Sequence, residues 1–138
     1  MALFVTNSPD LTTNGPLIAV KLWVPVGVKS DALPVDALAE IHIGLPYTCI
    51  QEGIATSLGL EPAGTINVTT ATKPTHKAHI YRIRVAFPDG QMSFEITAVE
   101  VPYMLRPKQR IKCLIGRDIL QYGTLHYDGR ANTFSLLF

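Results

Sequence analysis

The sequence lacks any long hydrophobic run. No stretch of its 138 residues approaches the roughly 18 consecutive apolar residues that a membrane-spanning helix needs. Residues 1–10 also lack the basic start and the apolar core of a secretory signal. We therefore expect a cytoplasmic protein that has no membrane partner.

The sequence also lacks a marked excess of charge of either sign. It contains 12 Lys and Arg against 11 Asp and Glu, so the formal net charge is +1. The densest basic segment, residues 108–112, is short and is interpreted as a solvated turn. Because nucleic-acid binding depends on clustered basic residues, we expect no nucleic-acid partner.

Cysteine is scarce, and motifs for bound cofactors are missing. The two cysteines, Cys49 and Cys113, lie in apolar surroundings and outside any CxxC or Cys/His spacing, so we interpret them as small buried hydrophobic residues. Sequence alone leaves open whether a disulfide joins them. A P-loop, a glycine-rich dinucleotide turn and a Gly-x-Ser-x-Gly elbow are all absent, and we expect no cofactor.

Alternating apolar residues predict strands along most of the chain. They appear at residues 37–43 and 65–70, and in two hairpins, one turning at Pro88-Asp89-Gly90 and one at residues 128–132. Residues 17–24 are apolar on both faces, which predicts a strand covered on two sides. Two short helices are predicted, at residues 51–58 and 118–122, each followed by a glycine.

The domain organisation is simple. We find no internal repeat, no low-complexity segment and no linker between two regions of different composition. A length of 138 residues suits one hydrophobic core. We expect a single domain over residues 1–138, in which residues 1–14 form an N-terminal arm.

Three stretches carry a resemblance to a known family. The first is AEIHIGLPYTCI at residues 39–50, followed by Leu-Gly-Leu at 58–60; the second is the hairpin region at residues 65–81; the third is CLIGRDIL at residues 113–120. In this order they resemble the retropepsin-like aspartic proteases, the single-domain relatives of pepsin. The resemblance implies an all-β fold, a closed and mostly antiparallel acid-protease-like barrel with one or two short helices.

The resemblance also implies a twofold homodimer and a flap. The apolar strands at the two chain ends, residues 3–5 and 134–138, are expected to interleave or pair in the dimer, and the N-terminal arm is a candidate part of that seam. The flap tip falls at residues 71–77. An extended peptide binding by strand addition beneath the flap is the expected ligand.

The catalytic position departs from the family pattern. In the family, two aspartates at the dimer floor share a proton, and one of them acts as the base toward water. Here Asp-Thr-Gly-Ala is replaced by His42-Ile43-Gly44-Leu45, so the acid, the bracing hydroxyl and the small alanine are all changed. We therefore expect a degenerate domain without aspartic protease activity.

The resemblance assigns roles to further residues. Arg117 and Asp118 are expected to be structural, with Asp118 at a helix start, where an acid suits the free amides. Pro46 stands where many members carry an acid that pairs with the arginine, so Arg117 is expected to pair elsewhere, with Asp118 or Glu52. The expected ligand contacts line the cleft: Gly44, Leu45, Thr72, Lys73, Pro74, Ile115 and Gly116.

Three interpretations of His42 remain open at this stage. It is a polar residue at a dimer seam that hydrogen-bonds to backbone, or a non-standard base of an active peptidase, or half of a metal site formed by two symmetry-related imidazoles. No third metal ligand is evident near His42 in the sequence, since His76 and His79 lie near the flap and His126 lies in the closing hairpin.

Overall fold

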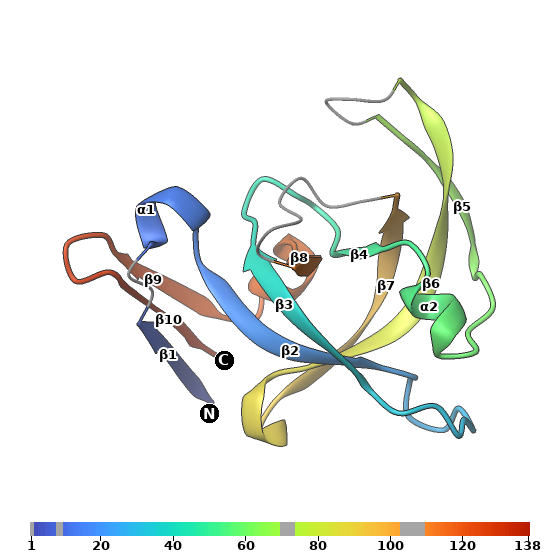
Figure 1. Cartoon of the computed structure of the whole chain (residues 1–138), viewed down its shortest axis with the longest axis horizontal. Helices are drawn as coiled ribbons and strands as arrows, with labels where there is room; N and C mark the ends of the chain where they lie inside the picture. The colour runs from blue at the N-terminus through green and yellow to red at the C-terminus, as the bar shows by residue number, and fades with distance from the viewer. Residues whose placement is uncertain (1, 8–9, 70–73, 103–109) are drawn as a thin grey trace.

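The computed structural model describes residues 2–7, 10–69, 74–102 and 110–138 (Figure 1). Short segments of helix are α1 (Leu11–Asn14), α2 (Ile54–Ser57), η1 (Pro88–Gly90) and α3 (Arg117–Leu120). The strands are β1 (Leu3–Asn7), β2 (Leu17–Trp23), β3 (Val35–Ile41), β4 (Cys49–Gln51), β5 (Gly64–Val68), β6 (His76–Ala86), β7 (Ser93–Val101), β8 (Ile111–Ile115), β9 (Thr124–Asp128) and β10 (Thr133–Leu137). The all-β prediction is confirmed.

The main sheet closes into a barrel. Its strand order is β2-β3-β8-β4-β7-β6, and a further pairing of β2 with β6 closes the ring. Most pairs are antiparallel, but β3 with β8 and β4 with β7 are parallel. β5 lies outside the ring as the partner of the long strand β6, and Figure 1 shows this hairpin projecting away from the barrel.

The hairpin between β6 and β7 forms as the alternating pattern predicts. Tyr81, Ile83 and Val85 are buried, and the strands pair antiparallel from Ile80–Val99 to Ala86–Ser93. The turn at 88–90 reverses the chain by placing Asp89 at φ 63° and Gly90 at φ 65°, a conformation that aspartate and glycine tolerate well.

The prediction that β2 is covered on both faces is wrong. Ile18, Val20 and Leu22 are buried, whereas Ala19 and Lys21 on the opposite face are exposed. One face of the strand therefore packs into the barrel core and the other forms the outer wall, as in most antiparallel sheets.

Both predicted helices are shorter than expected, since α2 covers Ile54–Ser57 and α3 covers Arg117–Leu120. Residues 49–51 form strand β4, so α2 is a single turn that precedes Gly59 at φ 73°. The sequence pattern missed α1, whose Leu11 is completely buried. No helix in the described part of the chain is long and apolar enough to cross a membrane.

The two chain ends pair with each other. β1 and β10 are antiparallel neighbours in a second sheet of order β1-β10-β9, and Figure 1 shows the termini side by side. Ring contacts of Phe4 and Phe138 with Phe87 and Phe94 join this sheet to the barrel. The segment expected to be an N-terminal arm is thus folded onto its own chain, and the pairing of terminal strands between two copies stays a prediction.

Candidate functional site: the loop after β3 and the turn before α3

The loop that carries His42 begins where β3 ends. The His42 backbone N–H donates to Ile115 O at 2.9 Å, and the Leu45 N–H donates to His42 O at 3.2 Å, which closes a turn. His42, Ile43 and Gly44 are exposed in the single chain. The imidazole lies against Gly44, where an added Cβ would stand 3.0 Å from His42 Cε1.

The second loop of the site lies against the first and requires a glycine. A Cβ on Gly116 would stand 2.7 Å from the Tyr47 carbonyl carbon and 3.0 Å from Leu45 O, which are backbone atoms that have little room to move. The Arg117 N–H donates to Leu45 O at 2.8 Å across the same contact. The two loops therefore form one unit through direct backbone contact. We call this unit, residues 42–48 and 115–118, the floor.

Hydrogen bonds of Thr48 and Asp118 hold the two loops together. The Thr48 hydroxyl is fully buried and donates to Asp118 Oδ1 at 2.8 Å, and the Thr48 N–H donates to Asp118 Oδ2 at 2.9 Å. The same hydroxyl accepts from the Gly116 N–H at 3.2 Å, and Asp118 Oδ1 also accepts from the Ile119 N–H at 3.0 Å. Asp118 is thus occupied by structural hydrogen bonds at the start of α3.

Arg117 has a different partner from the one expected. Its Nη1 donates to Ile43 O at 2.8 Å, so the guanidinium holds the exposed side of the His42 loop. Across the described residues no ion pair joins Arg117 to Asp118 or Glu52. The prediction of a carboxylate partner is therefore wrong, because a backbone carbonyl of the loop takes that place.

The residues expected to contact a ligand separate into two groups. Gly44 is exposed on the loop, and Pro74 is exposed at the start of β6, while Thr72 and Lys73 lie outside the described residues. Ile115 and Gly116 are buried behind the loop, so we correct their role: they pack the floor and offer no side-chain surface to a ligand. Sequence reasoning also gave Thr48 no role, although it is the threonine of the first motif.

A second apolar cluster connects the floor to the projecting hairpin. Cys49, Ala78 and Val99 are its buried members. Partly buried side chains pack against them from the floor, the hairpin and the neighbouring strands: Leu45, Ile66, Val68, Ile80, Val101 and Leu114. Leu45 therefore belongs to the surface on which the β5–β6 hairpin rests.

Both cysteines are free and buried, as predicted. Burial, reinforced by the charge of Asp118, raises the pKa of Cys49 to about 11. Burial also raises the pKa of the Cys113 thiol, and Cys49 and Asp118 add to the shift. Thiols held protonated in this way are poor nucleophiles and poor metal ligands, so neither cysteine supplies chemistry to the site.

Metal-ligand geometry is not assembled within the single chain. Among the described residues, no group of three or more His, Cys, Asp or Glu side chains is placed to hold a metal ion. A site formed by two copies of His42 would lie between subunits, and that hypothesis stays untested.

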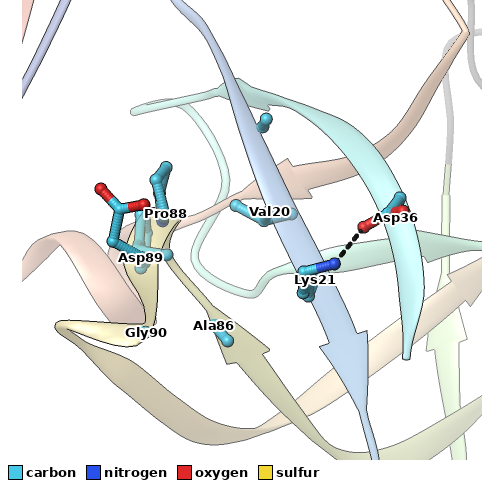
Figure 2. Close-up of a pocket in the computed structure, with 9 residues that line it drawn as sticks. Val20, Lys21, Asp36, Ala86, Pro88, Asp89 and Gly90 are labelled. Carbon is cyan, nitrogen blue, oxygen red and sulfur yellow. Dashed lines mark hydrogen bonds and ion pairs between the residues drawn. The ribbon is translucent and has the colours of Figure 1, made fainter. Parts of the chain in front are cut away.

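A hollow with an ion pair at its rim lies away from the His42 loop. It has a volume of about 480 Å³ and opens on the outer wall of the barrel, between the exposed face of β2 and the turn at Pro88 and Asp89 (Figure 2). The Lys21–Asp36 ion pair, at 2.7 Å, crosses its rim. His42 follows the opposite end of β3, roughly 20 Å along the strand from Asp36.

Comparisons with known proteins give the fold. No family model matches the chain, and no curated protein matches it. Among solved structures, the chain is similar to a retropepsin-like aspartic protease from Rickettsia conorii, with a TM-score of 0.56 and 11% sequence identity over 98% of this chain and 90% of that chain. The chain therefore has a retropepsin-like fold.

Proposed function

We propose that this protein is a degenerate retropepsin-like domain that binds an extended peptide without cleaving it. The observation that carries the proposal is the state of the floor: its loops are fully assembled, yet the loop at 42–45 contains no carboxylate. The neighbouring acid, Asp118, already accepts hydrogen bonds from Thr48 and Ile119. An aspartic protease needs two free carboxylates that share a proton, and this floor supplies none from either loop.

Exposed apolar groups on the same loop support a binding role. Ile43 is 66% exposed and Tyr47 is 55% exposed, although both belong to a loop that many backbone contacts hold in place. Large apolar side chains fixed on a rigid loop are typical of contact surfaces. Leu45 of the same loop packs against the second apolar cluster, to which Ala78 of the β5–β6 hairpin belongs.

We propose further that the functional form is a twofold dimer. Leu3 is 58% exposed and Val5 is 66% exposed on β1, which is an edge strand of the terminal sheet in the described part of the chain. An edge strand that exposes apolar side chains is a ready surface for pairing with a second copy.

The experiment that tests the proposal combines cleavage with binding. The purified protein is incubated with a peptide library between acidic and neutral pH, and products are identified by mass spectrometry. We expect no cleavage. Cleavage that disappears in His42→Ala would overturn the proposal in favour of a peptidase that uses an imidazole base. Metal found by elemental analysis after purification without chelator, and lost in the same variant, would favour the paired-histidine site.

Binding is tested with a matched pair of variants. Ile43→Asp changes the exposed floor, and Val26→Asp makes the same change at a side chain that is 73% exposed in the loop after β2. Peptides retained by the wild-type protein should bind at least about tenfold more weakly to Ile43→Asp, and equally well to Val26→Asp. Equal binding by all three proteins would show that the floor is not the peptide site.

A further inference from the structure

A small hollow lies between two strands that pair at one end and separate at the other. β6 and β7 pair as far as Ile80–Val99. Beyond this point His76–His79 remain paired only with β5, and Glu100–Val101 remain paired only with β4. Figure 1 shows β6 curving away from β7 here, and a hollow of about 220 Å³ lies between residues 76–79 on one side and Glu100 and Pro102 on the other.

The β6 side of this hollow offers free backbone hydrogen-bonding groups. Residues in a strand direct their N–H and C=O groups to the two edges alternately. Ile80 O accepts from Ala63 N at 2.8 Å, so the even-numbered residues at this end face the β5 side. The N–H and C=O groups of Lys77 and the N–H group of His79 therefore face the hollow, beyond the last pair with β7. A strand edge of this kind can pair with an added extended peptide.

The charges lining the hollow favour a cation. Glu100 is half-buried and Glu52 is exposed, and among the described residues neither carboxylate has a recorded hydrogen bond or ion pair. Among the described residues that line the hollow, Lys77 is the only lysine or arginine. The lining thus carries a net charge of −1, from two carboxylates and one ammonium.

Size determines what the hollow can hold. Pockets for whole small molecules usually measure about 300–1,000 Å³. A volume of about 220 Å³ is too small for such a ligand and suits a single side chain. A side chain delivered by a peptide backbone on the β6 edge would enter next to Glu100.

We propose that this hollow binds one arginine or lysine side chain of an extended peptide whose backbone pairs with the free edge of β6 at Lys77 and His79. The proposal deepens the peptide binding proposed above by naming a basic residue as the specificity element. It uses neither the His42 loop nor the dimer, so it can fail or succeed separately from them.

The test uses defined probes on the full chain. A fluorescein-labelled peptide Thr-Val-Arg-Val-Thr is titrated by fluorescence anisotropy, alongside the same peptide with glutamate in place of arginine and one with N-methylated valines. We expect the arginine peptide to bind at least about tenfold more tightly than the glutamate peptide, because a hydrogen bond to a charged group is lost. N-methylation should abolish binding, since it removes the N–H groups needed for strand pairing.

Matched glutamate variants locate the binding. Glu100→Gln and Glu52→Gln should each weaken the arginine peptide by about tenfold. Glu61→Gln is the control, since Glu61 is an exposed carboxylate outside the hollow, and it should leave binding unchanged. Circular dichroism confirms that each variant is folded.

Three results would overturn the inference. The first is that the arginine peptide does not bind at concentrations up to about 1 mM. The second is that the arginine and glutamate peptides bind equally well. The third is that Glu61→Gln weakens binding as much as Glu100→Gln does. If Ile43→Asp abolishes binding while Glu100→Gln does not, the peptide occupies the cleft floor alone. In that case the proposed function stands and the basic side-chain site falls.

Discussion

The Thr48 hydroxyl is the point at which the floor is most sensitive to a single change. Thr48→Val keeps the side-chain shape but removes the bond to Asp118 Oδ1 and leaves the Gly116 N–H without its acceptor. A hydrogen bond to a charged group is worth about 1.5–3 kcal/mol, and a buried orphaned donor costs about 1–3 kcal/mol. Because Thr48 is 0% exposed and its bond from the Gly116 N–H is buried, we expect a loss of about 3 kcal/mol in the free energy of unfolding.

Thr48→Ser is the matched control for this change. It keeps the hydroxyl and removes one buried methyl group, which should cost about 1 kcal/mol. Urea denaturation followed by the fluorescence of Trp23 and by circular dichroism measures both variants, at one protein concentration because association would shift the midpoint. If the valine variant is no less stable than the serine variant, the hydroxyl does not hold the two loops together and this account of the floor is wrong.

Three further predictions concern packing, thiol reactivity and assembly. Gly116→Ala should lower the free energy of unfolding, measured by urea denaturation, by about 3 kcal/mol, because its Cβ would stand 2.7 Å from backbone. The control Gly64→Ala, whose Cβ would meet only a side chain at 3.7 Å, should change stability by less than about 1 kcal/mol. Equal losses would contradict the close approach at Gly116. The raised pKa values of Cys49 and Cys113 predict slow labelling by a thiol reagent at pH 8 in the native state and fast labelling in urea. The native labelling rate of Cys49 should increase as the pH approaches about 11. Rapid native labelling at pH 8 would show that the thiols are accessible. Val5→Lys should convert a dimer to a monomer in light scattering at micromolar concentration, and a monomeric wild type would contradict the proposed dimer.

Local patterns predicted the strands well, because side-chain alternation is a property of neighbouring residues. Tyr81, Ile83 and Val85 are buried as their spacing indicates. The ends of elements were less predictable: β3 ends at Ile41, two residues before the predicted end, because the next residues enter the floor loop. Alternation also gave no sign that β2 pairs with β6 to close the barrel, since that contact joins residues far apart in sequence.

The two loops of the candidate site were located from the sequence, whereas their binding of a ligand stays a prediction. The resemblance located both loops, since their motifs are contiguous in the chain. It could not separate residues that face a ligand from residues that pack behind it, and Ile115 and Gly116 prove to be of the second kind. Nor could it find the partner of Arg117, because a backbone carbonyl, here that of Ile43, leaves no signature in the residue types.

The floor shows that the fold does not depend on a carboxylate at positions 42–45. At positions 42, 43 and 45 the hydrogen bonds that hold the loop use the loop's own backbone groups: His42 N with Ile115 O, Ile43 O with the Arg117 side chain, and Leu45 O with the Arg117 N–H. These bonds form whichever side chains the loop carries, so substitution of an aspartate and a threonine there removes no support from the floor. Substitution is restricted instead at three other residues. Gly116 has no room for a Cβ, and Thr48 and Asp118 supply the hydroxyl and the carboxylate that hold the two loops.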